Sequence, residues 1–152
     1  MRRPAIIAAI VAAVAVFLVL SALLARALSV GGAEDAALTD LVRAEARGDT
    51  AAVIAAVTGC RAHTACRARA AALTASLQHP GQIQIAEINP SSGFALGATL
   101  GTARVAWVVG GSLPRVQCVR VRHTGNVISG FGIELLRVSL RIRSNADCPS
   151  RY

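Results

Sequence analysis

The chain has 152 residues and a formal net charge of +8 at neutral pH, and all 16 of its Lys and Arg positions are arginine. Only 3% of the residues are aromatic, which argues against single-stranded nucleic acid as a partner because such binders stack bases on several rings. A basic chain of this kind is better suited to anionic lipid headgroups or wall polymers.

The first element is an apolar run from Ala5 to Ala25 that directly follows Arg2 and Arg3. A helix of this length spans about 30 Å, which matches the hydrocarbon thickness of a bilayer. A cleaved signal peptide has a shorter apolar centre of roughly 7 to 15 residues. The length therefore favours an uncleaved signal anchor with a single pass through the cell membrane.

Cleavage of this segment is the alternative, because Ala25-Arg26-Ala27 forms an A-x-A pattern that a signal peptidase can cut. Cleavage after Ala27 would release the rest of the chain as a secreted protein. In either case the basic N-terminus is expected to stay in the cytoplasm and the C-terminal part to lie outside. The expected division is a signal anchor or signal peptide at 1–29 and one extracytoplasmic domain at 30–152, which still has a net charge of +5.

Four cysteines follow the apolar run, and an even number outside the cytoplasm predicts two disulfides. The simplest of the three connectivities pairs Cys60 with Cys66 and Cys118 with Cys148. A metal site at Cys60, His63 and Cys66 is the less favoured alternative, because structural zinc needs four ligands and no second cluster is evident. No metal or cofactor is expected.

The sequence after the apolar run predicts a break at Gly31-Gly32 and then a first domain helix from Ala33 to the Gly48-Asp49 pair. Leu38, Leu41 and Val42 give this helix an apolar stripe. Glu34 and Asp35 are expected to lie in its first turn, where the helix dipole favours negative charge. Its other charged residues are expected to face solvent: Arg43, Glu45 and Arg47.

Two more helices are predicted. The helix Ala51–Val57, capped by Asp49 or Thr50, is almost wholly apolar and is expected to be buried. The helix Thr64–Leu77 begins with Thr64 as its cap and ends before His79-Pro80-Gly81. Its narrow apolar face consists of Ala70, Leu73 and Leu77.

The second half of the chain has the alternation of β-strands instead. Phe94–Gly101 is either a short strand or a loop, and Thr124–Asn126 is the expected turn of the last hairpin. The expected strands are Gln82–Ile88, Thr102–Val109, Arg115–His123 and Val127–Arg143.

The apolar alternation switches face in both arms of this hairpin. Val116 and Cys118 occupy even positions, whereas Val119 and Val121 occupy odd ones, and the second arm makes the same switch at Leu135-Leu136. Paired switches at one level are typical of a bulge or sharp bend across two neighbouring strands. We therefore expect a strongly curved antiparallel sheet.

The hairpin also carries the main charge feature, five arginines expected to share one sheet face. They are candidates for anion binding, although the favoured interpretation is a solvated face on which arginine stems cover apolar neighbours. Glu87 and Glu134, also on strands, are candidates for acid–base work, but no nucleophile, paired carboxylates or phosphate loop is evident and no catalytic residue is assigned. The arginines are Arg120, Arg122, Arg137, Arg141 and Arg143.

Helices followed by a curved antiparallel sheet resemble the NTF2-like, cystatin-like α+β fold. The stretch Leu41–Val53, in which a helix ends in Gly-Asp before a short second helix, is similar to the helical part of that superfamily. The whole chain resembles small actinobacterial extracytoplasmic proteins of this type. The resemblance implies about three helices on a sheet of about four strands. It implies no single function, because the superfamily includes enzymes, ligand carriers and assembly subunits.

Together these features predict a membrane-anchored extracytoplasmic binding or assembly module. Its partner is expected to be a protein or a small ligand at the concave sheet face, in addition to the membrane at residues 5–25. The alternatives are a small secreted enzyme that uses a pocket carboxylate or histidine, and an electrostatic binder of anionic lipid or wall polymer.

Overall fold

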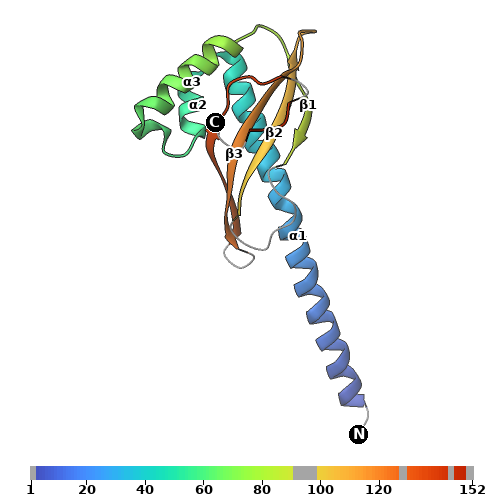
Figure 1. Cartoon of the computed structure of the whole chain (residues 1–152). Helices are drawn as coiled ribbons and strands as arrows, with labels where there is room; N and C mark the ends of the chain where they lie inside the picture. The colour runs from blue at the N-terminus through green and yellow to red at the C-terminus, as the bar shows by residue number, and fades with distance from the viewer. Residues whose placement is uncertain (1–2, 91–98, 127–129, 144–145, 150–152) are drawn as a thin grey trace.

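The computed structural model describes residues 3–90, 99–126, 130–143 and 146–149 and shows an α+β protein with one long helix that extends far beyond the rest (Figure 1). Within these ranges the helices are α1 (Arg3–Arg47), α2 (Thr50–Ala56), the 3-10 helix η1 (Cys60–Ala62) and α3 (Thr64–Leu77). The strands are β1 (Ile83–Asn89), β2 (Thr99–Val109), β3 (Arg115–Asn126) and β4 (Gly130–Val138).

Helix α1 is continuous over 45 residues, so the predicted break at Gly31-Gly32 is wrong. A glycine inside a helix costs only about 1 kcal/mol relative to alanine, and the helix continues on both sides of the pair. The predicted end of the helix is correct, because Gly48 follows Arg47 with a φ of +74°, which favours glycine.

The strands form one antiparallel sheet in the order β1-β2-β3-β4, with β1 and β4 at its edges. The C-terminal part of α1, together with α2 and α3, packs on one face, which we call the inner face (Figure 1). Strand β2 confirms the predicted alternation, since Ala103, Val105, Trp107 and Val109 all point inward and are fully buried. Leu38 and Leu41 of α1 complete this core.

The two short helices differ in detail from the prediction. Asp49 caps α2 by accepting a hydrogen bond from the Ala52 amide at 2.9 Å, as one of the two expected caps. Burial of all of α2 is wrong, because Val53 is its only buried residue and the small alanines around it reach the surface. Thr64 does not cap α3; it is the first helical residue. The predicted inner face of α3 is confirmed.

The strands keep the predicted order with shifted ends. Residues 99–101 join β2, whereas the rest of the stretch Phe94–Gly101 lies outside the described residues. Thr124–Asn126 pair with Gly130–Gly132 as part of β3, so the predicted turn is not centred on them. The last strand ends at Val138 rather than at Arg143. The hydroxyl of Ser139 explains this end, since it bonds the Cys118 amide and the Leu140 carbonyl and competes with regular pairing.

The predicted bulge is present in only one of the two strands. In the β3–β4 pair, Arg120 faces Arg137 while Val121 faces Leu135, so Leu136 is the extra residue of a bulge in β4. The β2–β3 pairing runs without a shift from Thr99↔His123 to Trp107↔Arg115, so a bulge in β3 is wrong.

The apolar switch in β3 has a different cause, which is burial on both faces. Val116 and Cys118 lie on the outer face of the sheet and are still buried. A disulfide ties Cys118 to Cys148, and the Arg104 Nε donates to the Ala146 carbonyl at 3.3 Å. The C-terminal segment 146–149 therefore covers the outer face at this place.

Both predicted disulfides are present, Cys60–Cys66 and Cys118–Cys148. The first joins η1 to the start of α3, and the second joins β3 to the C-terminal segment. Disulfides persist in oxidising compartments, so they indicate an extracytoplasmic space for the domain.

Replacement of Cys60 and Cys66 together by alanine is expected to destabilise the domain by about 2 kcal/mol, because the crosslink closes only a short loop. Thermal unfolding followed by circular dichroism measures this loss. Reduction of the wild-type protein provides the comparison, since it opens both disulfides and should cost more. An unchanged unfolding temperature in the double variant would contradict a stabilising role for this disulfide.

Candidate binding pocket and buried polar groups

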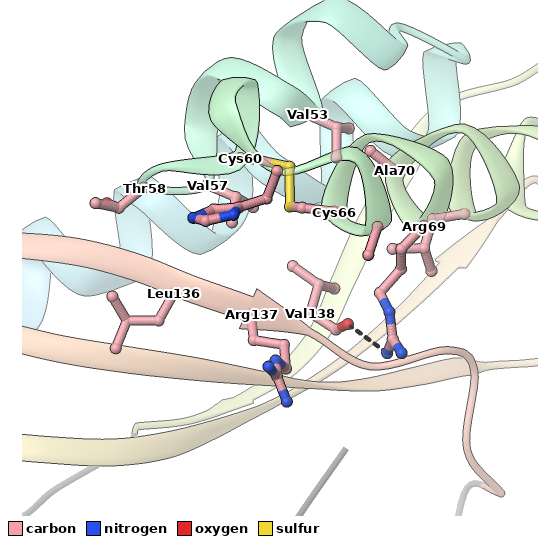
Figure 2. Close-up of a pocket in the computed structure, with 13 residues that line it drawn as sticks. Val53, Val57, Thr58, Cys60, Cys66, Arg69, Ala70, Leu136, Arg137 and Val138 are labelled. Carbon is pink, nitrogen blue, oxygen red and sulfur yellow. Dashed lines mark hydrogen bonds between the residues drawn. A yellow bond between two sulfur atoms is a disulfide. The ribbon is translucent and has the colours of Figure 1, made fainter.

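A cavity of about 460 Å³ lies between the helical segment α2–η1–α3 and the end of β4 (Figure 2). The end of α2 is fixed to β4 by backbone contacts, because the Thr58 amide donates to the Leu135 carbonyl at 2.7 Å. The residues that line the cavity are Val53, Val57, Thr58, Cys60, His63, Ala65, Cys66, Arg69, Ala70, Leu73, Leu136, Arg137 and Val138.

The floor of this cavity is apolar. It consists of buried core side chains, among them Val53, Val57, Ala70, Leu73 and Val138. These residues belong to the core, so their positions are set by the packing of the helices on β4. The floor can accept a hydrocarbon group without reorganising the fold.

The polar lining of the cavity is basic. It consists of Arg69 on α3, Arg137 on β4, His63 and the hydroxyl of Thr58, and no acidic residue is among the described lining residues. Arg69 reaches from α3 toward the end of β4, where its Nη1 donates to the Val138 carbonyl at 3.5 Å (Figure 2). Arg137 starts at the same end of the strand, and its side chain points away from the helices (Figure 2). The cavity therefore combines apolar surface with positive charge.

The five arginines proposed from the sequence do not form one face. Arg120 and Arg137 lie opposite each other in the β3–β4 pair, and Arg122 is next along the outer face. Arg141 and Arg143 follow the end of β4 and lie beside Leu113 and Pro114 at the other end of the sheet, so their placement on the strand is wrong. Arg141 and Arg143 were placed on the strand because the strand was expected to continue past Ser139.

Glu87 and Glu134, the two candidate acid–base groups, are far apart in the sheet. Glu87 lies on edge strand β1 and Glu134 on edge strand β4. Each has an arginine beside it on the outer face, at 3.6 Å for Glu87–Arg104 and 3.1 Å for Glu134–Arg122. They do not form a catalytic pair.

Two carboxyl groups of α1, Glu34 and Glu45, are buried, although Glu34 was expected in the first turn of a helix and Glu45 at the surface. Glu34 accepts a hydrogen bond at 2.7 Å from the Nε2 of His123, and the Nδ1 of His123 lies 3.4 Å from the Thr99 hydroxyl. Glu34 is 1% exposed and His123 is 7% exposed. This pair joins α1 to β3, the element that carries the histidine.

Glu45, the second of these groups, is fully buried, so its expected exposure is wrong. Burial raises the pKa of Glu45 to about 7, and the Gln117 amide offsets part of this rise. The Gln117 Oε1 accepts from the Trp107 indole at 3.0 Å, but its Nε2 and both Glu45 oxygens form no hydrogen bond of ordinary geometry. Glu45 is therefore readily protonated near neutral pH.

The spacing of these two carboxylates in the sequence could have predicted their burial. Glu34, Leu38, Leu41 and Glu45 follow one another at steps of four, three and four residues, so they share one face of a helix. The apolar stripe was assigned only to Leu38, Leu41 and Val42 because carboxylates are rarely buried.

The metal alternative at Cys60, His63 and Cys66 is contradicted by the disulfide, which uses both thiols. Within the described part of the chain, no three His, Cys, Asp or Glu residues are grouped as metal ligands would be. Comparison of the chain with family models, with curated proteins and with solved structures finds no match, so the cavity and the buried groups are interpreted from their own chemistry.

Proposed function

We propose that this chain is a membrane-anchored extracytoplasmic module of the NTF2-like type that binds a partner at the membrane surface as an assembly subunit. The observation that carries the proposal is the continuity of α1. The same helix contains the apolar segment Ile6–Ala25, which is long enough to cross a bilayer and is exposed in the structure, and the core residues of the domain.

The distance between the two parts of α1 is short. Between Ala25 and Glu34, a residue buried in the domain, the helix rises by about 13 Å. An anchor at Ile6–Ala25 would hold the domain close to the membrane and in a defined direction. A domain on a flexible linker would sample many heights and orientations instead. A defined orientation lowers the entropic cost of binding a partner in the membrane.

The charges on the outer face favour a protein partner over simple electrostatic adhesion. Arg122 and Arg104 each lie beside a carboxylate, at 3.1 Å from Glu134 and 3.6 Å from Glu87. Nearby opposite charges weaken the attraction of this face for a uniformly anionic surface. Alternating charges are better suited to a partner with a complementary pattern.

Insertion of a short flexible Gly-Ser segment between Gly31 and Gly32 is expected to abolish partner capture, because it uncouples the domain from the anchor. The matched control replaces both glycines by alanine, which keeps the helix and should preserve capture. The measurement is crosslinking of the full chain in cells, followed by mass spectrometry of the recovered complexes.

The same experiment tests the anchor itself. The intact mass of the recovered protein should include residues 1–27, and a mass that begins after Ala27 would overturn the anchored state. Recovery of no partner and no second copy with the wild-type chain would reject an assembly role. Equal recovery with the flexible insertion would reject the importance of the rigid helix.

A further inference from the structure

We propose that the cavity between α2, η1, α3 and β4 binds a small single-chain carboxylic acid, whose hydrocarbon chain lies on the apolar floor and whose carboxylate binds Arg69. This site is independent of the assembly role proposed above. It depends on the shape and charge of the cavity, and neither requires a particular partner at the membrane.

The first argument is the size and surface of the cavity. A volume of about 460 Å³ falls in the range of small-ligand pockets. The floor contains several branched side chains, Val53, Val57, Leu73 and Val138, whereas no Phe, Tyr or Trp is among the described lining residues. A flexible aliphatic chain suits such a floor better than a flat aromatic ring or a sugar, which would need stacking surfaces or several hydrogen-bonding groups.

The second argument is the state of Arg69. Its contact within the cavity is the 3.5 Å bond from Nη1 to the Val138 carbonyl, and its side chain is otherwise exposed. A guanidinium has five N–H donors in a planar fork, so this contact leaves donors that can bind a carboxylate in bidentate geometry. The bond to β4 also holds the group over the apolar floor, where the charged end of a chain would emerge.

The third argument is the sign of the surrounding charge. His63 and Arg137 also line the cavity, and no acidic residue is among the described lining residues. An ammonium or another cation would be repelled by this lining, and an uncharged chain would leave the charge of Arg69 unused. An anionic head on one apolar chain satisfies both the floor and the rim.

The test is photo-crosslinking of the full chain, held in phosphatidylcholine nanodiscs, with a diazirine derivative of decanoic acid. The neutral comparison is the same probe with an alcohol in place of the carboxyl group. Peptide mapping should place the acid probe on α3 and β4. Arg69→Gln should weaken labelling by about tenfold, the loss expected for one charged hydrogen bond.

Two further variants separate a site from general attraction. Arg61→Gln removes the same charge from an exposed position of η1 that does not line the cavity and should leave labelling unchanged. Ala65→Trp, at an exposed lining position, should block the cavity and abolish labelling while the unfolding temperature stays near that of the wild type.

Three results would overturn the proposal. One is labelling of the acid probe only along Ile6–Ala25, which would show partition into the bilayer. The second is equal labelling by the acid and the alcohol. The third is an equal response of Arg69→Gln and Arg61→Gln, which would show attraction to the general positive charge of this part of the domain.

Discussion

Replacement of Glu45 by glutamine is expected to stabilise the domain by about 3 kcal/mol above pH 7 and to have little effect below the ordinary pKa of a glutamate. The reason is the burial of the carboxyl group between α1 and the sheet, where its ionised form has no hydrogen bond of ordinary geometry. Glutamine has nearly the same shape as glutamic acid and carries no charge that burial would penalise.

The direction of the pH dependence follows from the two proton affinities. The folded state holds the proton of Glu45 up to about pH 7, whereas the unfolded chain releases it near the ordinary value of 4.5. The wild-type protein therefore loses stability as the pH rises through this window, and the loss is complete above the folded pKa. The glutamine variant has no such loss, so the difference between the two proteins should grow across the same window.

Chemical unfolding of both proteins between about pH 4 and pH 8 measures this difference. Asp40→Asn is the matched control, because Asp40 is an exposed carboxylate on the same helix and its ion pair with Arg43 lies at the surface. That variant should change the free energy of unfolding by less than about 1 kcal/mol at every pH. If the effect of Glu45→Gln on the free energy of unfolding does not change with pH, folding does not raise the pKa of Glu45.

The burial of Glu34 and Glu45 shows what the sequence could and could not predict about α1. The pattern of Leu38 and Leu41 correctly predicted a helix with one buried face. It did not predict that the buried face continues through both carboxylates, because a carboxylate is buried only when a specific partner or a proton offsets its charge. Those partners, His123 and Gln117, come from β3 and are distant in sequence.

The sheet shows a second limit. The alternation in β2 identified its inward residues because only one of its faces joins the main core. In β3, burial on both faces by different elements gave the same switch of pattern that a bulge gives. The segment 146–149, which covers the outer face at Cys118, has no strand pattern of its own. Its position follows from the disulfide, whose pairing the sequence favoured but whose location on the sheet it could not specify.

The cavity was beyond prediction for a related reason. Its floor and rim come from α2, η1, α3 and β4, and the relevant arginines lie on two elements that meet only in the folded chain. Nothing in the sequence distinguishes Arg69 from Arg67, the other arginine of the same helix. Arg137 was selected for a sheet face, and it also lines this cavity.

Replacement of His123 by leucine is expected to cost about 1–3 kcal/mol of folding stability, the range for a buried polar group that loses a hydrogen-bond partner. The change takes away the 2.7 Å hydrogen bond of Glu34 and leaves a carboxyl group that is 1% exposed without that partner. Chemical unfolding of the full chain measures the cost. Replacement of both Glu34 and His123 by leucine should be less damaging than the single change, since no buried carboxyl group remains.

The consequence extends to the coupling of the domain to its anchor. Among the residues of α1 whose burial the structure describes, Glu34 is the buried residue closest in sequence to Ile6–Ala25, and its partner His123 is paired with Thr99 of β2. Loss of the pair should therefore loosen the sheet at this end first. Hydrogen exchange of the His123→Leu variant should rise around Thr99 and His123 while Trp107 and its neighbours stay protected. Uniform acceleration along the sheet would instead show that the pair supports global stability and not the local attachment of α1.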